Sequence, residues 1–309
     1  MPPAKMHADE ADIDAALVRR LLAAQFPRWA SLAVTPVESN GTVNAIYRVG
    51  DDMAVRLPRV AGGVDDVRTE VEHLPRLAPR VPFAVPAPLG KGEPGDGYPW
   101  PWYVYRWLDG ANPAIGAVAE PGLLAADLAR FVTALHRVEP TGLPTAYRPG
   151  PLAPRDQETR DAIAQLDGVI DTGAATAAWE SALRAPEWAG PPVWVHADLQ
   201  LGNLLTTGGR LSAVIDFGCM GRGEPAVDLI TAWSLLTGEA RKEFRAALDV
   251  DDATWARGRG WALSIALIEL PYYRTRNESI ARTARHVIEE VLADHAAEES
   301  IADHTVEKL

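Results

Sequence analysis

Residues 193–218 read VWVHADLQLGNLLTTGGRLSAVIDFG, and this stretch decides the fold of the chain. It contains the pattern His-x-Asp-x-x-x-x-Asn, followed after an expected hairpin by Asp-Phe-Gly at the end of an apolar run. The pattern places three oxygen-bearing side chains, Asp198, Asn203 and Asp216, in a fixed order. Carboxylate and amide oxygens are the ligands that Mg2+ prefers, and a carboxylate can also orient a hydroxyl that attacks phosphorus. The residue types and their order therefore predict a phosphoryl-transfer site.

The spacing of these residues resembles the catalytic loop and the Asp-Phe-Gly segment of protein kinases. In that arrangement the loop aspartate orients the acceptor hydroxyl, while the asparagine and the second aspartate bind Mg2+. The resemblance makes Asp198 the predicted catalytic residue and makes Asn203 and Asp216 the predicted metal ligands. Aspartate and asparagine also form ordinary turns and caps, but three of them at this spacing favour the catalytic interpretation.

Two details of the sequence indicate which group of kinase-like proteins the stretch resembles. Residues 196–198 are His-Ala-Asp rather than His-Arg-Asp, and residues 223–229 read GEPAVDL. With these features the stretch resembles the aminoglycoside phosphotransferase family of small-molecule kinases, which includes macrolide and choline kinase relatives. The resemblance is dense over residues 194–233 and looser over residues 36–270. It implies a protein-kinase-like fold and a small-molecule hydroxyl as the phosphate acceptor.

The family resemblance also implies supporting roles for two residues. His196 is expected to brace the catalytic loop by packing and hydrogen bonding rather than to transfer a proton. Asp228 corresponds to a family position that supports the loop from the start of a helix. Both residues are therefore interpreted as structural.

The pattern before Gly110 predicts a small antiparallel sheet with helices. Two β-like runs are joined by Gly-Asp-Asp, which is a hairpin signature, and a third run is rich in aromatic residues. The expected elements are strands at residues 45–49, 53–57 and 102–108 and helices at residues 12–25 and 64–77. Residues 1–110 are therefore expected to form an N-terminal nucleotide-binding lobe that ends at a hinge.

After Gly110 the pattern turns mostly helical. The expected helices span residues 123–138, 157–183, 226–236, 241–248, 253–270 and 281–295. Residues 139–156 are rich in Pro and Gly and are expected to run over the surface. The sequence thus predicts an α+β fold of two lobes, with a larger helical C-lobe at residues 111–299 that carries the catalytic loop and acceptor pocket, and a tail at residues 300–309.

A small-residue turn lies between two β-like runs, where kinases place the loop that covers the phosphates. The turn contains Ser39, Asn40, Gly41 and Thr42. Backbone N–H groups in such a turn can cradle phosphate oxygens. The segment has one glycine rather than three, so an ordinary hairpin turn remains the alternative.

Arg56 occupies the position at which protein kinases carry a strand lysine. The resemblance implies that it holds the nucleotide phosphates and pairs with a helix glutamate, for which the spacing favours Glu70 and leaves Glu72 as a competitor. Arginine can form a two-pronged bond to phosphate or carboxylate, so the electrostatic role is retained. A surface strand residue is the alternative interpretation of Arg56.

The segment YRWLDG at residues 105–110 aligns with the kinase hinge. The resemblance implies that Leu108 offers backbone groups to the purine and that Tyr105 fills the gatekeeper position beside the base. The sequence does not distinguish ATP from GTP as the phosphate donor. Trp102 is expected to pack in the core.

The acceptor site is expected within residues 255–276. Glu269, Tyr272 and Tyr273 lie around Pro271, which should kink or end the helix. A glutamate beside aromatic rings can bind an ammonium group by charge and cation–π contact, but a buried capping network is an equally simple interpretation. Further candidates of the same kind are Asp156, Glu158 and Asp161.

Composition excludes several other classes of protein. The formal net charge is −12 and the isoelectric point is about 5.1, which argues against nucleic-acid binding and is compatible with a cationic acceptor. No apolar run reaches the roughly 20 residues of a membrane span. The lone Cys219 excludes an internal disulfide and fits a cytoplasmic location. Acidic residues near the C-terminus, including Glu290, Asp294 and Glu298, fit a solvated helix face.

The sequence therefore predicts an enzyme that moves the γ-phosphate of ATP or GTP to a small-molecule hydroxyl with Mg2+ as cofactor. An aminoglycoside or related amino-sugar antibiotic is the favoured acceptor, which implies a role in antibiotic resistance. The alternatives are a kinase of another metabolite (macrolide, sugar, choline or homoserine type) and a catalytically silent nucleotide-binding module. The Arg56 substitution keeps the silent module open, whereas the retained Asp198, Asn203 and Asp216 argue against it.

Overall fold

The N-terminal part of the chain folds around a five-stranded antiparallel sheet. A computed structural model describes residues 10–37 and 43–306 of the chain. The strand order is β1-β2-β3-β5-β4, and every neighbouring pair is antiparallel. The strands are β1 Val34–Pro36, β2 Asn44–Val49, β3 Met53–Pro58, β4 Pro88–Gly92 and β5 Trp102–Arg106. The expected hairpin is confirmed as β2 and β3, which meet where Val49 lies opposite Met53.

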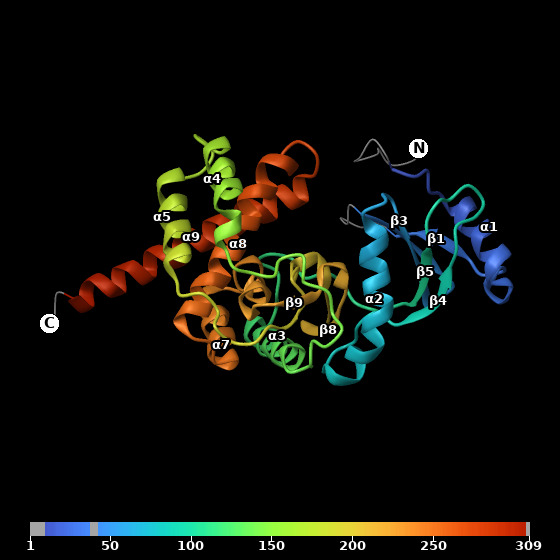
Figure 1. Cartoon of the computed structure of the whole chain (residues 1–309), viewed down its shortest axis with the longest axis horizontal. Coiled ribbons are helices and arrows are strands. Elements are labelled where there is room, and N and C mark those ends of the chain that lie inside the picture. Colours follow the sequence, from blue (N-terminus) through green and yellow to red (C-terminus); the bar gives the residue numbers. More distant parts are fainter. Residues whose placement is uncertain (1–9, 38–42, 307–309) are drawn as a thin grey trace.

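Each face of this sheet is covered by one helix, because side chains alternate between faces along a strand. On one face, Trp102 and Val104 pack in a cluster with Leu21 of α1 (Ala15–Gln25). On the other face, Tyr103 and Tyr105 pack against α2 (Gly63–Leu77). Figure 1 shows this N-lobe, coloured blue to teal, beside a larger helical lobe. The predicted fold of a small sheet lobe and a helical lobe is confirmed.

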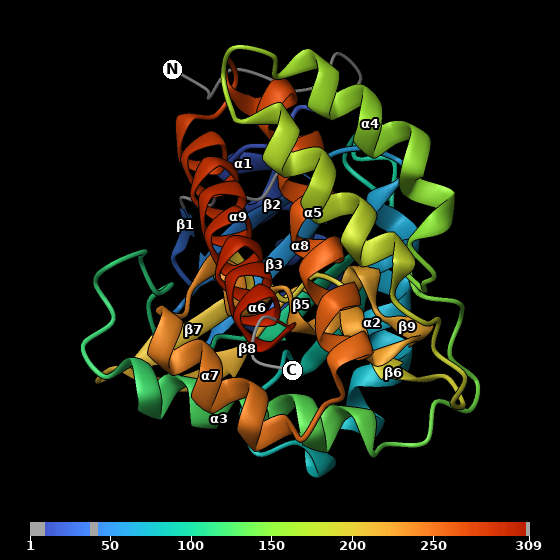
Figure 2. The same ribbon diagram turned by 90° about the vertical axis from the view of Figure 1, so that its left-hand side faces the viewer.

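The C-lobe is built from helices that surround one large apolar core. Its helices are α3 Pro121–His136, α4 Asp156–Gln165, α5 Thr172–Arg184, α6 Thr231–Ser234, α7 Gly238–Leu248, α8 Asp252–Tyr273 and α9 Glu278–Val306. Phe131, Trp179, Trp233 and Trp261 are among the largest buried side chains of this core. Figure 2 shows α3 and α7 crossing at one side of the lobe, while α4 and α5 flank α8 and α9.

Two short pairs of strands enclose the catalytic stretch. β6 (Val193–Val195) pairs with β9 (Gly221–Gly223), and β7 (Leu204–Thr207) pairs with β8 (Arg210–Val214). The second pair is the expected hairpin, with Gly208 and Gly209 at positive φ in its turn. The sequence pattern did not predict the first pair, since strands of three residues carry little periodicity.

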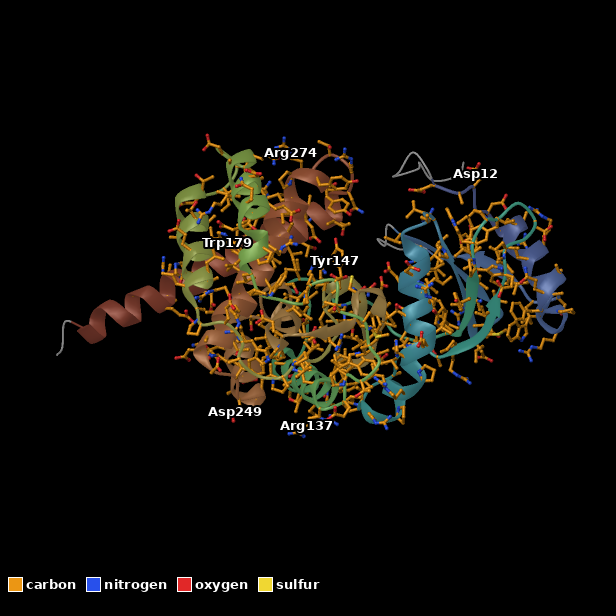
Figure 3. All side chains as sticks on the ribbon, viewed as in Figure 1. Asp12, Arg137, Tyr147, Trp179, Asp249 and Arg274 are labelled. Atoms are coloured by element: carbon orange, nitrogen blue, oxygen red, sulfur yellow. The ribbon has the colours of Figure 1, made fainter. Side chains whose placement is uncertain are left out.

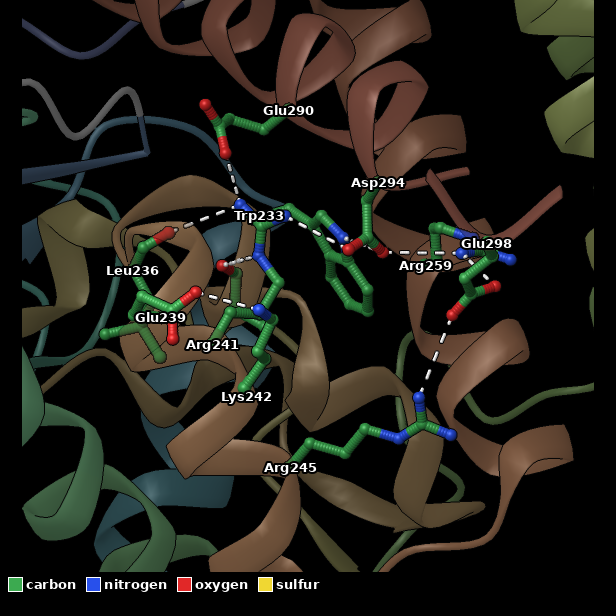
Figure 4. Close-up of polar contacts among 11 residues, drawn as sticks. Trp233, Leu236, Glu239, Arg241, Lys242, Arg245, Arg259, Glu290, Asp294 and Glu298 are labelled. Atoms are coloured by element: carbon green, nitrogen blue, oxygen red, sulfur yellow. Dashed lines mark hydrogen bonds and ion pairs between the residues drawn. The ribbon is translucent and has the colours of Figure 1, made fainter. Parts of the chain in front are cut away.

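Helix α9 is fixed to the C-lobe by a network of ion pairs, drawn in Figure 4. Arg241 of α7 is buried and bonds to Glu290 and Asp294, and Arg259 of α8 bonds to Asp294 at 3.3 Å and to Glu298 at 2.6 Å. The expectation of a solvated acidic face was therefore wrong for these three acidic residues. The buried arginines need partners, and the acidic residues of α9 supply them.

Three expected helices differ from the observed ones. The helix expected at residues 157–183 is broken into α4 and α5, and Gly168 adopts a positive φ of 71° in the connection. The helix expected at residues 226–236 is a 3-10 turn at Pro225–Leu229 followed by the short α6. Pro271 lies inside the last turn of α8, which continues past it to Tyr273 and ends there, two residues after the proline. Across the described residues, none of the helices combines the length and apolarity needed to span a membrane.

Candidate active site

The carboxylate of Asp198 lies at the centre of the site and is held by three donors. Its Oδ1 accepts from Arg148 Nη1 at 2.9 Å and from Gln200 Nε2 at 3.1 Å. Its Oδ2 accepts from Asn203 Nδ2 at 2.9 Å. The side chain of Asp198 is still 23% exposed. The carboxylate is therefore fixed in orientation and open on one side to an incoming group.

Asn203 and Asp216 present oxygens on the same site. Asn203 Nδ2 also donates to the backbone oxygen of Asp198 at 2.8 Å, so its amide nitrogen is used within the loop and its carbonyl oxygen remains as the free ligand atom. Asp216 has a φ of +60° and a side chain that is 45% exposed. One amide oxygen and one exposed carboxylate form a donor set that fits Mg2+, which prefers hard oxygen ligands and keeps water or phosphate as the others.

Asp228 accepts hydrogen bonds from the backbone of the catalytic loop. It is fully buried, and its Oδ1 accepts from the N–H of Ala197 at 2.8 Å while its Oδ2 accepts from the N–H of His196 at 3.1 Å. Oδ2 also contacts His136 Nε2 at 2.9 Å. Ala197 has a φ of +63°, a left-handed conformation that is costly for a residue with a side chain. The two bonds from Asp228 maintain this conformation, which turns Asp198 outward.

His196 connects the loop to the strand that leads into Asp216. Its ring accepts from the N–H of Asp198 at Nδ1, at 3.2 Å, and its Nε2 contacts the backbone oxygen of Ile215 at 3.1 Å. The assigned tautomer therefore carries its hydrogen on Nε2. The ring is fully buried and lies 4.5 Å from the ring centroid of Phe217. This geometry is that of a brace rather than of a proton carrier.

Arg56 binds Glu70, as the spacing favoured, and not Glu72. Arg56 Nη1 donates to both carboxylate oxygens of Glu70, at 2.8 and 2.7 Å, and Nη2 donates to Asp216 Oδ1 at 2.8 Å. With its amide oxygen facing Arg56, Asn44 accepts from Nη2 at 2.9 Å and from Nε at 3.2 Å. Glu72 is mostly exposed. Burial raises the pKa of Glu70, and the charge of Arg56 opposes that shift.

Tyr105 lies behind this ion pair, at the expected gatekeeper position. Its hydroxyl donates to Glu70 Oε2 at 3.1 Å, and burial raises its pKa well above the ordinary value. Leu108 follows β5 and is partly exposed. The backbone N–H of the preceding Trp107 donates to the backbone oxygen of Asp52. Ser39, Asn40, Gly41 and Thr42 lie outside the described residues.

A small, half-open hollow lies beside the catalytic loop. Gln200 bridges Asp198 and Glu269, since its Nε2 also donates to Glu269 Oε1 at 3.3 Å. Burial raises the pKa of Glu269 to about 7, with a smaller contribution from Asp198. The pocket is lined by Gln200, Ile230, Ser234, Ala262, Ile265, Ala266, Glu269, Thr283, Ala284 and Val287. Glu269 is the one ionisable side chain of that lining.

The other predicted acceptor residues lie away from this pocket. Tyr272 is 42% exposed and stacks under Arg276, and Tyr273 packs edge-on against Tyr272. Asp156 is used by Arg160 and by the indole of Trp179. Glu158 pairs with Arg155, and Asp161 accepts from Gln157. Of these contacts, the hydrogen bond from Trp179 to Asp156 joins α5 to α4, and the others are local to the end of α8 or to α4 and the turn before it.

Sequence reasoning missed Arg148, which contacts Asp198 directly. The expectation that residues 139–156 run over the surface was wrong for Leu143, Ala146 and Leu152, which are buried. These apolar residues within a Pro- and Gly-rich loop were the signal that the segment packs against the lobe. Figure 3 shows Tyr147, the neighbour of Arg148, on the side of the C-lobe that faces the N-lobe.

Known proteins share this fold. A model of the phosphotransferase enzyme family matches residues 34–261. The fold is similar to that of wild-type aminoglycoside 2'-phosphotransferase-IIIa in its GDP complex, with a TM-score of 0.74 and 20% identity over 92% of this chain and 100% of that one. It is also similar to a gentamicin complex of APH(2")-IIa, with a TM-score of 0.61 and 17% identity over 91% and 97% of the two chains.

A third similar structure is the macrolide 2'-phosphotransferase MphH from Brachybacterium faecium, with a TM-score of 0.59 and 20% identity over 89% of this chain and 98% of that one. A search of curated proteins found no significant match. The family match covers most of the chain and includes the loop that carries Asp198 and the segment that carries Asp216. The chain is therefore a member of the phosphotransferase enzyme family, and it is a small-molecule kinase.

Proposed function

We propose that the chain transfers the γ-phosphate of a nucleoside triphosphate to a hydroxyl of an amino-sugar natural product. The observation that carries this proposal is Glu269, a half-buried carboxyl group connected to Asp198 through Gln200. An ammonium group of the acceptor would favour the ionised form of Glu269. A hydroxyl on a neighbouring carbon would then lie near Asp198. The pocket thus contains one carboxyl group that can bind an ammonium group, and a single side chain, Gln200, separates it from the catalytic carboxylate of Asp198.

In the proposed reaction, Asp198 orients the acceptor hydroxyl for in-line attack on the γ-phosphorus. Asn203 Oδ1 and Asp216 would hold Mg2+, which supplies charge neutralisation on the phosphates when bound. Arg56, fixed by Glu70, places a positive charge beside Asp216 on the nucleotide side. His196 and Asp228 keep the loop in the conformation that exposes Asp198.

The donor to be tested first is GTP, with ATP as the comparison. Tyr105 is a bulky side chain at the back of the nucleotide site, held there by its hydrogen bond to Glu70. Two of the similar structures with TM-scores above 0.7 are GDP complexes. These observations support the choice of donor to test first.

The lining of the pocket favours one kind of acceptor over another. Apart from Gln200, Ser234, Glu269 and Thr283, its residues are aliphatic. An aminoglycoside carries several ammonium groups, and each buried charge needs a partner. An acceptor with one amine places a single ammonium group beside Glu269 and needs no further charged partner in this lining. A macrolide is such an acceptor, so macrolides are the second candidate class beside the aminoglycosides.

The test is a coupled assay of nucleoside diphosphate release with Mg2+, run with GTP and ATP across aminoglycosides, macrolides, amino sugars and amino alcohols. Turnover with an amino-bearing acceptor supports the proposal. Turnover restricted to acceptors without an amine would overturn the role of Glu269. Expression of an active chain in a sensitive bacterium should raise the minimum inhibitory concentration of the accepted antibiotic.

A further inference from the structure

Arg148 reaches the catalytic carboxylate from a distant segment of the chain. It lies 50 residues before Asp198, yet its Nη1 donates both to Asp198 Oδ1 at 2.9 Å and to the backbone oxygen of Ala197 at 2.8 Å. Its side chain is 13% exposed. Among the described contacts, this is the cationic side chain that bonds to the carboxylate of Asp198.

Backbone hydrogen bonds on both sides of Arg148 fix the segment that carries it. Ala146 N–H donates to the oxygen of Arg222, and Glu224 N–H donates to the oxygen of Pro149. Gly221 allows this close approach, since a Cβ there would lie 2.4 Å from the backbone nitrogen of Ala146. The segment therefore lies beside β9, to which it is joined by an isolated parallel bridge between Thr145 and Arg222.

Arg148 completes the support of the strained peptide at Ala197. Asp228 binds the N–H of Ala197, and Arg148 binds its oxygen. The residue that precedes Asp198 is thus held from both sides by oppositely charged side chains. A change at Arg148 would free both the Asp198 side chain and the peptide that carries it.

The hydrogen bonds on Asp198 leave room for one more donor. A carboxylate offers about four lone-pair directions. Arg148 and Gln200 use those of Oδ1, and Asn203 uses one of Oδ2. The remaining lone pair belongs to Oδ2, so a single hydroxyl can donate to Asp198, and it must approach from that oxygen.

The guanidinium of Arg148 is held by its Nη1 alone among the described contacts. Its Nε has no hydrogen-bond partner within the described residues, as is also true of the Nε atoms of Arg48, Arg76 and Arg259. The two bonds of Nη1, to the Asp198 carboxylate and to the Ala197 oxygen, therefore place the charge of Arg148 beside the catalytic loop.

We propose that Arg148 is a positioning residue for phosphoryl transfer: it fixes Asp198 so that one lone pair of Oδ2 faces the acceptor hydroxyl. The inference rests on the proposed function. In the step itself, the acceptor oxygen forms a bond to the γ-phosphorus, and the bond from phosphorus to the β–γ bridging oxygen breaks. The nucleoside diphosphate leaves with that electron pair, and the hydroxyl proton passes through Asp198 Oδ2 to solvent. Arg148 holds its charge beside these atoms without bonding to the nucleotide.

The test uses the full chain and a transition-state analogue, so that it needs no known acceptor. GDP and ADP are titrated with Mg2+ in the absence and presence of aluminium fluoride, which mimics the phosphoryl group in transfer to a water oriented by Asp198. In R148Q, affinity for the diphosphate alone should stay within about twofold, because Arg148 bonds to Asp198 and Ala197 and not to Arg56 or Asp216 on the nucleotide side. Affinity in the presence of aluminium fluoride should fall roughly 10- to 100-fold, as for loss of one preorganised donor.

Two further variants separate positioning from general structural damage. R148K retains the charge and should recover part of the lost affinity, since one ammonium N–H can still reach Asp198. R130Q removes an exposed arginine of α3 and should behave as the wild-type chain. Equal aluminium fluoride affinity in wild type and R148Q would overturn the inference, as would an equal loss of affinity for the diphosphate alone. A wild-type chain that binds neither diphosphate would instead overturn the proposed function, and the inference with it.

Discussion

At the scale of single residues, the site separates into groups that react and groups that hold them. Asp198 is the one acidic side chain of the loop that is both fixed by three donors and open to an incoming group. Asp228 has a carboxylate as well, but it is fully buried and used by the backbone of the loop. The same side chain type thus has two roles, and its surroundings decide which.

The first prediction concerns this difference. Asp198→Asn preserves the shape of the side chain but removes the charge that orients the hydroxyl, so turnover should fall roughly 10^2- to 10^4-fold. Nucleotide affinity should change little, because Asp198 does not face the Arg56 side of the site. Steady-state kinetics and a nucleotide titration check both statements. Wild-type turnover in this variant would remove Asp198 from the mechanism.

The second prediction concerns the pH dependence of stability at Glu269. Its pKa is raised from 4.5 to about 7 by burial. The unfolded chain therefore releases this proton near pH 4.5, whereas the folded chain holds it up to about pH 7. Stability contributed by this group is present below pH 4.5 and is lost as the pH rises through 7.

Glu269→Gln should remove that loss. At pH 8 the variant should be more stable than the wild type by on the order of 3 kcal/mol, from 1.36 kcal/mol per unit of pKa shift, and the two should converge toward pH 4.5. Urea unfolding at pH 5, 6, 7 and 8 measures the difference. The same variant should raise the KM for an amino-bearing acceptor and leave the KM for the nucleotide unchanged. A pH-independent difference between the two proteins would contradict the assignment.

At the scale of elements, α9 depends on buried charge rather than on apolar contact alone. Arg241 is 5% exposed and bonds to Glu290 and Asp294 as well as to the backbone oxygens of Ala232 and Leu236. Arg241→Ala would remove the arginine that binds Glu290 and one of the three donors that bind Asp294, which would keep Trp233 and Arg259. Since both carboxylates are partly exposed, the expected loss is about 2–3 kcal/mol of unfolding free energy.

The neighbouring Lys242 provides a matched control for Arg241. Lys242 lies on the same helix and pairs with Glu239, but both side chains are mostly exposed. Lys242→Ala should change the unfolding free energy by no more than about 0.5 kcal/mol. Chemical denaturation of both variants checks the contrast. Equal effects would show that the network of Figure 4 is a surface feature.

The elements also show which parts of the fold follow from local sequence. The β2–β3 and β7–β8 hairpins were predicted because each has turn residues between β-like runs. The β6–β9 pair was not predicted, since its strands have three residues each and the second reads Gly-Arg-Gly. Tertiary contacts, such as the approach of Ala146 to Gly221, define these strands. The division of α4 from α5 was also not predicted, although Gly168, at positive φ in the connection, interrupts the helical pattern there.

The same distinction holds within the site. Asp198, Asn203 and Asp216 were predicted because their spacing is a local motif. Arg148 was missed because no local pattern connects it to a carboxylate 50 residues away. For the partner of Arg56 the spacing favoured Glu70. In the structure Glu70 lies on the side of α2 that faces Arg56, whereas the side chain of Glu72 is mostly exposed. Glu269 was one of several acidic candidates, and its position beside Gln200 distinguishes it from the others.

At the scale of the whole molecule, the two lobes are joined by charge across the site. Arg56 of the sheet bonds to Asp216 of the C-lobe, and a backbone bridge connects Ala84 with Ala213. The nucleotide and Mg2+ would bind between these same groups. Ligand binding should therefore stabilise the chain as a whole rather than one lobe.

The fourth prediction follows from this arrangement. GTP or ATP at 100 times its dissociation constant, with Mg2+, should add about 2.7 kcal/mol to the unfolding free energy. Removal of Mg2+ with a chelator should abolish most of that gain in the wild type. In Asp216→Asn the chelator should have little further effect, because a metal ligand is already lost. Thermal unfolding with and without chelator tests this, and a gain insensitive to Mg2+ would contradict the metal assignment.

The left-handed peptide at Ala197 has a consequence for how this chain tolerates mutation. A saturation library at position 197 should retain glycine, which adopts positive φ without strain, and should deplete valine, isoleucine and threonine, whose branched side chains oppose it. Position 198 should instead be depleted for every substitution, including the smallest. The two adjacent codons would thus carry different selective constraints, one imposed by the path of the backbone and the other by the reaction.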